Sequence, residues 1–168
     1  TCTIVWVLLS WVRTGKPSSV AAINGAISGL AGITPAAGFI TPQAAFFLGI
    51  ALGFGSYYGI VLLKERLKID DALDVSSVHG ITGIMGAMAI GLVATSAVNP
   101  IGPNGLFYGN PAQFAIQGLG VIVGAALGFF GTYAILKVID KTIGLRVKDE
   151  EEDVGLDITQ HAEKARNE

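Results

Sequence analysis

The sequence predicts an all-α polytopic membrane protein, and three observations support this fold class. The chain is 51% hydrophobic and only 14% charged, with a mean hydropathy of +0.59, whereas about a quarter of the residues of a soluble domain are charged. Residues 17–63 and 75–136 contain no Asp, Glu, Lys or Arg. The chain also has 23 glycines among its 168 residues, which is typical of helices that pack closely in lipid.

Four apolar segments reach the length of a membrane-spanning helix, about 20 residues. They cover residues 18–38, 43–63, 72–96 and 112–139. A shorter apolar run, 1–12, lacks the basic start and the cleavage site of a signal peptide. We interpret it as a partial span in a fragment whose N-terminal part is missing. The expected organisation is a transmembrane region over 1–143 and a polar tail over 144–168.

Local signals mark the ends and faces of these segments. Pro35 and Gly38 end the first full span, and Asn110-Pro111 starts the last one as N-cap and first helical residue. Glycines recur at intervals of three or four residues, which lets helix backbones approach closely. The sets are Gly25, Gly29 and Gly32; Gly49 and Gly53; Gly80, Gly83 and Gly86; and Gly120, Gly124, Gly128 and Gly131. We expect most of them to serve helix packing.

Basic residues follow the first, third and fifth apolar segments, whereas the connections 38–42 and 95–111 carry no charge. Positive residues in alternate loops are what the positive-inside rule predicts for a multi-pass protein in a cell membrane. The basic residues in these loops and at the start of the tail are Arg13, Lys16, Lys64, Arg66, Lys68, Lys137, Lys141, Arg146 and Lys148. We therefore expect the C-terminal tail to be cytoplasmic.

His79 is the only residue between 75 and 136 that could change its charge near neutral pH. An ionisable residue inside a span costs free energy to insert and therefore indicates a functional site. On a helix that continues from Asp71, His79 lies about 12 Å further along, near the middle of a ~30 Å hydrocarbon layer. A neutral imidazole there suits the passage of a small polar molecule or a proton. The alternative is a structural histidine that is hydrogen-bonded across helices.

Helical spacing places several small or polar residues on one face with His79. On an α-helix Val75, Thr82, Gly83 and Gly86 share this face. We therefore expect a histidine, a hydroxyl and small residues to line a single seam.

Two other motifs point to different classes of protein. Asn110-Pro111-Ala112 matches the aquaporin tripeptide, but Gln113 follows it where aquaporins typically have an arginine after one copy. Ser28-Gly29 and His79 resemble the nucleophile and base of an intramembrane serine protease, but Ala26 stands where the rhomboid-type pattern needs a glycine. We therefore expect no enzymatic activity.

The chain also lacks the features of metal and nucleic-acid binding. Cys2 is the only cysteine, which excludes an internal disulfide framework and a cysteine-based metal site. The net charge of −2 is uninformative, since most acidic residues follow Lys148. We expect no metal, no cofactor and no nucleic-acid partner.

Several ordered motifs resemble ammonium transporters of the Amt type, within the Amt/Mep/Rh superfamily. Asp70-Asp71-x-x-Asp74-Val75-x-x-Val78-His79-Gly80-x-x-Gly83 is similar to the signature around that family's second pore histidine. The further matches are Gly15-Lys16-Pro17-Ser18, Gly29-Leu30-Ala31-Gly32-Ile33-Thr34-Pro35-Ala36-Ala37-Gly38, Gly144-Leu145-Arg146-Val147, and Gly155-Leu156-Asp157 with His161. The resemblance covers essentially the whole chain.

This resemblance implies the last part of an eleven-helix, inverted-repeat ammonium channel fold with a cytoplasmic C-terminus. It implies a homotrimer in which each protomer conducts through a pore between its two repeats. Ammonium loses its proton outside and passes as ammonia along an apolar pore that contains a histidine pair. An ammonium sensor of the same fold, signalling through its tail, is the alternative.

The resemblance also assigns residues to the pore. It makes His79 the inner member of the histidine pair, with Thr34, Ile27 and Val75 near the pore wall. It gives Asp71 and Asp74 a structural role at the start of the same helix, where carboxylates favour the helix dipole.

The tail carries candidate regulatory residues. Gly155-Leu156-Asp157 provides a flexible residue, an apolar anchor and a possible helix N-cap in succession. By resemblance, PII-type signalling proteins can approach this cytoplasmic face, and Thr159 occupies a position that is phosphorylated in some plant relatives. His161 matches the tail histidine of the family, but Ala162 follows it where the family usually has glycine.

Overall fold

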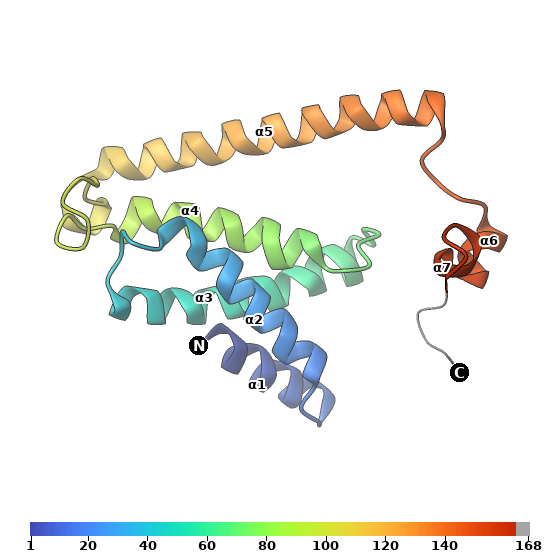
Figure 1. Cartoon of the computed structure of the whole chain (residues 1–168). Coiled ribbons are helices and arrows are strands. Elements are labelled where there is room, and N and C mark those ends of the chain that lie inside the picture. Colours follow the sequence, from blue (N-terminus) through green and yellow to red (C-terminus); the bar gives the residue numbers. More distant parts are fainter. Residues whose placement is uncertain (164–168) are drawn as a thin grey trace. The chain divides into compact units, whose positions relative to one another are not determined.

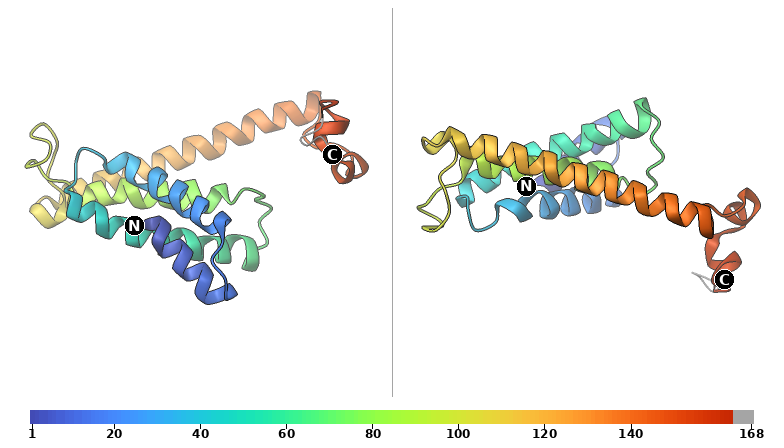
Figure 2. Two further views of the ribbon diagram at one scale, coloured as in Figure 1. Left: turned by 60° about the horizontal axis from the view of Figure 1, so that its bottom comes forward. Right: turned by 90° about the horizontal axis from the view of Figure 1, so that it is seen from above.

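The computed structural model describes residues 1–163. The chain divides into two units, Thr1–Val123 and the residues from Gly124 onward, and each is described by itself. Every regular element in residues 1–163 is a helix (Figures 1 and 2).

The first unit begins with three helices. They are α1 (Cys2–Thr14), α2 (Ser19–Ile33) with the short 3₁₀ turn η1 (Thr34–Ala36), and α3 (Pro42–Ile60) with the π-helix η2 (Val61–Arg66). Two of these helices begin at hydroxyl caps. Ser18 Oγ accepts a hydrogen bond from the Ala21 N–H at 3.3 Å, and Thr41 Oγ1 accepts one from the Ala44 N–H at 3.2 Å.

The rest of the first unit contains the helix that carries His79. The π-helix η3 (Ser76–Ile81) leads into α4 (Thr82–Val93), and the 3₁₀ turn η4 (Leu106–Tyr108) precedes α5 (Pro111–Thr142). Pro111 is the first residue of α5, as the Asn110-Pro111 signal predicts. α5 begins in the first unit and continues into the second.

Four helical stretches in the described residues are long and apolar enough to cross a membrane. They are Ser19–Ala36, Pro42–Arg66, Ser76–Val93 and Pro111–Thr142. Each overlaps one of the four predicted segments, and the shorter apolar helix Cys2–Thr14 overlaps the predicted run 1–12. The clearest difference is at the third stretch, where the helix starts after residue 72.

The core of the first unit lies where α1, α2 and α3 pack against one another, while α4 packs against α2 and α3 (Figure 1). Trp6, Ala21 and Leu52 are buried there. Trp6 Nε1 donates a hydrogen bond to Ser56 Oγ at 2.7 Å, and the Trp6 ring packs edge-on against Tyr57 with centroids 5.0 Å apart. This contact ties α1 to α3 in the interior.

Several of the predicted packing glycines lie at these helix contacts. A Cβ at Gly25 would lie 2.6 Å from the Cβ of Trp6, and a Cβ at Gly53 would lie 2.6 Å from the Cβ of Val5. A Cβ at Gly86 would collide with the carbonyl oxygen of Gly32. Glycine is therefore required where α2 crosses α4, because their backbones are in direct contact.

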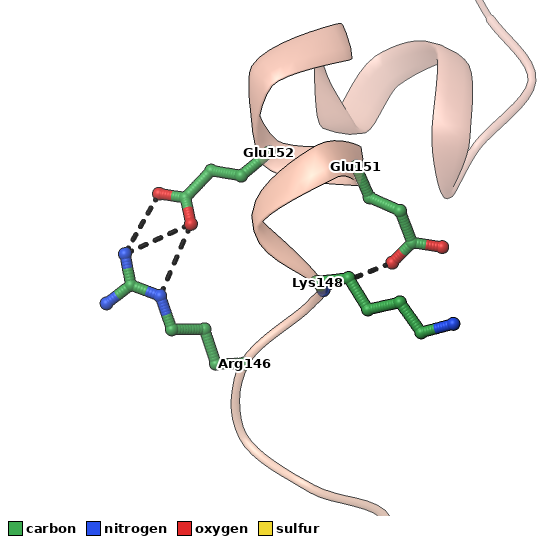
Figure 3. Close-up of polar contacts among 4 residues, drawn as sticks. All are labelled: Arg146, Lys148, Glu151 and Glu152. Carbon is green, nitrogen blue, oxygen red and sulfur yellow. Dashed lines mark hydrogen bonds and ion pairs between the residues drawn. The ribbon is translucent and has the colours of Figure 1, made fainter.

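The second unit contains the end of α5 and the tail, with α6 (Asp149–Val154) and α7 (Leu156–Thr159). Arg146 Nη2 lies 3.0 Å from Glu152 Oε2, and the Lys148 N–H donates to Glu151 Oε2 at 3.3 Å (Figure 3). Gly155 separates the two short helices with a φ of 107°, which a side chain would rarely tolerate.

Candidate functional site

The helix that carries His79 begins at Val75, because Asp71 caps it. Asp71 Oδ1 accepts a hydrogen bond from the Val75 N–H at 2.9 Å, and Oδ2 accepts one from the Ser76 N–H at 2.7 Å. Asp74 has a φ of 57°, a left-handed conformation that prevents the helix from extending back to Asp71. The helix therefore starts three residues after the beginning of the apolar segment at residue 72.

This later start also shortens the helical path that leads to His79. The helical rise from Val75 to His79 is about 6 Å, half of the ~12 Å expected for a helix that continues from Asp71. The N–H group of Ser76 holds the pKa of the Asp71 carboxyl below its usual value, with a smaller contribution from Val75. Asp71 therefore remains an ionised acceptor.

The expected single seam around His79 is divided in the structure. Val75 and His79 are exposed, and a Cβ at Gly83 would meet no atom within 4 Å. By contrast, Thr82 and Gly86 are buried, and Thr82 Oγ1 donates to the carbonyl of Val78. The reason is the π-helix Ser76–Ile81, in which each residue advances by a smaller angle than in an α-helix.

The four residues expected at the pore wall are all exposed in the first unit. Ile27 is 37% exposed and Val75 49%, and Thr34 and His79 are also exposed. They lie on α2, η1 and the helix of His79, and α2 packs against both η3 and α4 while η1 packs against α4. Thr34 Oγ1 donates to the carbonyl of Leu30 at 2.6 Å. Because its one proton is used in this hydrogen bond, the Thr34 hydroxyl can offer a further partner only an acceptor.

Two ion pairs at the end of α3 were not foreseen from the sequence. Lys64 Nζ lies 2.9 Å from Asp74 Oδ1, and Arg13 Nη2 lies 2.7 Å from Glu65 Oε2. The adjacent residues Lys64 and Glu65 thus contact two different segments of the chain. The spacing of ten residues across a loop could have suggested the first pair, but no local signal indicates the second.

The tail candidates lie around α7 in the second unit. Thr159 Oγ1 donates to the carbonyl of Gly155 at 3.0 Å, and His161 is exposed. Asp157 is the second residue of α7, whose N-cap position is occupied by Gly155. The expected N-cap role of Asp157 is therefore wrong: α7 starts at Leu156, two residues earlier than an N-cap at Asp157 would place it.

Two other chemistries have no site in the part of the chain that the structure describes. No group of three or more His, Cys, Asp or Glu side chains there could hold a metal ion. Ser28 is fully buried, its hydroxyl forms no hydrogen bond to the described residues, and His79 is exposed. The arrangement thus lacks the accessible serine–histidine pair that a serine protease needs.

Comparisons with known proteins point to one family. The family model described as "Ammonium Transporter Family" matches residues 1–166. "Ammonium transporter 1" of Dictyostelium discoideum is 55% identical over 160 residues, which are 95% of this chain and 34% of that protein. The "Ammonium transporter" of Bacillus subtilis is 42% identical over 160 residues, which are 95% of this chain and 40% of that protein. These relatives are transporters and not enzymes, as expected.

Solved structures support the fold. The crystal structure of Saccharomyces cerevisiae Mep2 matches with a TM-score of 0.81 and 31% identity, over 89% of this chain and 35% of that chain. A structure described as "Sensor Amt Protein" matches with a TM-score of 0.81 over 95% of this chain and 38% of that chain, at 24% identity, which shows the fold alone. The chain spans about a third to two fifths of the length of the curated relatives it matches.

Proposed function

The chain belongs to the ammonium transporter family, and from this premise we propose that it supplies part of a pore that carries ammonium or ammonia across a cell membrane. It is an all-helical, multi-pass membrane protein of this family. The observation that carries the proposal is His79, an exposed imidazole on a helix that is otherwise uncharged from Val75 onward.

The open face around His79 supports a role in a pore rather than contact with lipid. Gly86 lies against Gly32 of α2 and Thr82 is buried, whereas the His79 side chain lies on the exposed side of the helix. The neighbouring positions Gly80 and Gly83 leave space beside the imidazole, since a Cβ at either would meet no atom within 4 Å. Exposing an imidazole to hydrocarbon costs free energy. The exposed surface of the His79 side chain is therefore better suited to contact with a polar permeant than with lipid.

The surrounding side chains fit the passage of a neutral molecule. Ile27 and Val75 would give the wall an apolar character, which disfavours a desolvated cation. An imidazole that carries one proton can both donate and accept a hydrogen bond, so the His79 side chain offers what ammonia requires. Potassium has no proton to lose and would be rejected at the dehydration step. A second histidine from the remainder of the transporter would complete the pair.

Assembly and regulation belong to the same proposal. We expect a homotrimer, a cytoplasmic tail, and a PII-type signalling partner at the cytoplasmic face, with Gly155, Asp157, Thr159 and His161 as regulatory positions. A phosphate on Thr159 would replace the hydroxyl that donates to Gly155 and add about −1.5 to −2 charges. Such a charge beside Asp157 would favour undocking of the tail.

The proposal is tested with His79→Ala in protein produced from its complete coding region. We expect ammonium-dependent flux in reconstituted vesicles to fall about tenfold or more, the change that corresponds to the loss of one good hydrogen bond. Membrane insertion should be unchanged. Ile122→Ala, which shortens an exposed side chain on α5, serves as the control and should conduct normally.

Flux and potassium rejection equal to wild type in His79→Ala would refute the pore role of this residue. The sensor alternative predicts a different result. Wild-type protein would then show no useful flux, and an ammonium-dependent signal would be lost when residues 148–168 are deleted.

A further inference from the structure

Two wide-turn helices flank the short connection between α3 and α4. The π-helix η2 (Val61–Arg66) precedes this connection, and the π-helix η3 (Ser76–Ile81) follows it. π-helical turns are rare and are frequently found at functional sites. A rare conformation next to His79 must be stabilised by specific contacts.

The first four N–H groups of the His79 helix all have acceptors before the helix begins. The Asp71 carboxylate accepts from Val75 and Ser76, at 2.9 and 2.7 Å. The Asp74 carbonyl accepts from the Ser77 N–H at 3.1 Å and from the Val78 N–H at 2.9 Å. These groups have no partner inside a helix, so Asp71 and Asp74 together determine where the helix starts.

Lys64 connects this start to the preceding helix. Its Nζ lies 2.9 Å from Asp74 Oδ1, so η2 holds the residue whose carbonyl begins η3. The Lys64 side chain is 45% exposed, and exposed ion pairs contribute little to overall stability. We therefore expect the Lys64–Asp74 pair to act by fixing the position of Asp74 at the start of η3, and not by adding to the overall stability of the fold.

We propose that Asp71 and Lys64 are positioning residues for His79: they hold the wide-turn helix Ser76–Ile81 in the register that turns His79 to the open face and Thr82 to the packed face. The proposal rests on the proposed function for the meaning of that open face. It concerns the register of this helix, which can be measured without any flux.

Loss of the Asp71 carboxylate should change this register. The Val75 and Ser76 N–H groups would lose their acceptors, and they could regain them by pairing with the carbonyls of residues 71 and 72 in α-helical turns. Each residue advances by a larger angle in an α-turn than in a π-turn. His79 would then rotate from the open face, and Thr82 would become accessible.

The test uses single cysteines in a cysteine-free background, Cys2→Ala in this chain, with protein from its complete coding region in membranes. His79→Cys should react quickly with a water-soluble thiol reagent and Thr82→Cys slowly. In Asp71→Ala the ratio of the two rates should fall about fivefold, which corresponds to the loss of one capping interaction. Leu73→Ala, which shortens an exposed side chain in the same loop, is the control and should leave the ratio unchanged.

A second set of variants keeps the test decisive if Asp71→Ala does not fold. Lys64→Met and Asp74→Asn each remove the ion pair, and Asn tolerates the left-handed conformation at residue 74. The double variant should shift the reactivity ratio no further than the stronger single variant, since both remove the same contact. Unchanged ratios in all folded variants would overturn the proposal. The two proposals can also fail separately. If the reactivity ratios shift but His79→Ala conducts normally, the positioning role is supported and the proposed pore function is refuted.

Discussion

α2 and α5 are both apolar helices with glycines every three or four residues, but they use these glycines differently. In α2, a Cβ at Gly25 would lie 2.6 Å from Trp6 Cβ, and a Cβ at Gly29 would lie 2.9 Å from Cys2 Cβ. In α5, a Cβ at Gly120, which belongs to the same unit as α2, would meet no atom within 4 Å. Glycine spacing therefore permits close helix contact, but a suitably placed partner is needed before that contact forms.

The face of α2 shows what such a partner requires. Ala21, Gly25, Ser28 and Gly32 are the buried residues of this helix, and they follow one another at intervals of three or four. The neighbouring helices supply Trp6, Leu52 and the backbone at Gly86. Each small residue on this face of α2 is thus matched by a neighbouring side chain or backbone. Substitutions there should change the free energy of unfolding more than substitutions on α5.

The largest effect is expected for Gly86→Ala. The added Cβ would collide with the Gly32 carbonyl oxygen, a backbone atom that cannot rotate away as a side chain could. We expect the free energy of unfolding to fall by about 1–3 kcal/mol, measured by denaturant titration of the purified protein in detergent. An unchanged value would show that α2 and α4 are further apart than their backbones indicate.

A smaller effect of opposite sign is expected for Ser28→Ala. Ser28 Oγ is fully buried and has no hydrogen-bond partner in residues 1–163, and a buried unsatisfied hydroxyl costs free energy. Its removal should raise the free energy of unfolding by about 1 kcal/mol. The matched control is Ser56→Ala, which removes the hydroxyl that accepts from Trp6 and donates to the Leu52 carbonyl, and it should destabilise. If both variants destabilise equally, Ser28 has a partner.

The smallest effect is expected for Gly120→Ala on α5, where a Cβ would meet no atom within 4 Å. An alanine fits the open space at this position and favours a helix, so the variant should be stabilised by roughly 0.5 kcal/mol. The same denaturant titration measures it. A loss of more than about 1 kcal/mol, as for Gly86→Ala, would instead indicate that α5 packs its glycines against a neighbouring protein surface.

The sequence predicted the helices well, because the signals for them are local. Long uncharged runs predicted the long apolar helices, and Asn110-Pro111 predicted the start of α5 at Pro111. Pro35 and Gly38 predicted the end of the first full span, where η1 ends at Ala36 and Gly38 has a φ of 81°. Such signals depend only on neighbouring residues.

The face of the His79 helix could not be predicted in the same way. Helical periodicity assumes α-helical turns, and the π-helix Ser76–Ile81 breaks that assumption without any change in hydrophobicity. Asp71 carried a signal for the start of this helix, since a carboxylate close to a helix start is a potential cap, but it does not indicate π-helical turns. The Arg13–Glu65 contact joins residues 52 positions apart, and only the fold reveals it.

The ion pairs at the end of α3 have a consequence for how the chain is made. In the orientation proposed above, Arg13 and Lys64 would help to retain their loops on the cytoplasmic side during insertion, before they pair, since orientation depends on basic residues and little on acidic ones. After folding, Glu65 and Asp74 lie against these two cations. The same basic residues would thus help to orient the chain in the membrane during synthesis and would form ion pairs between chain segments after folding.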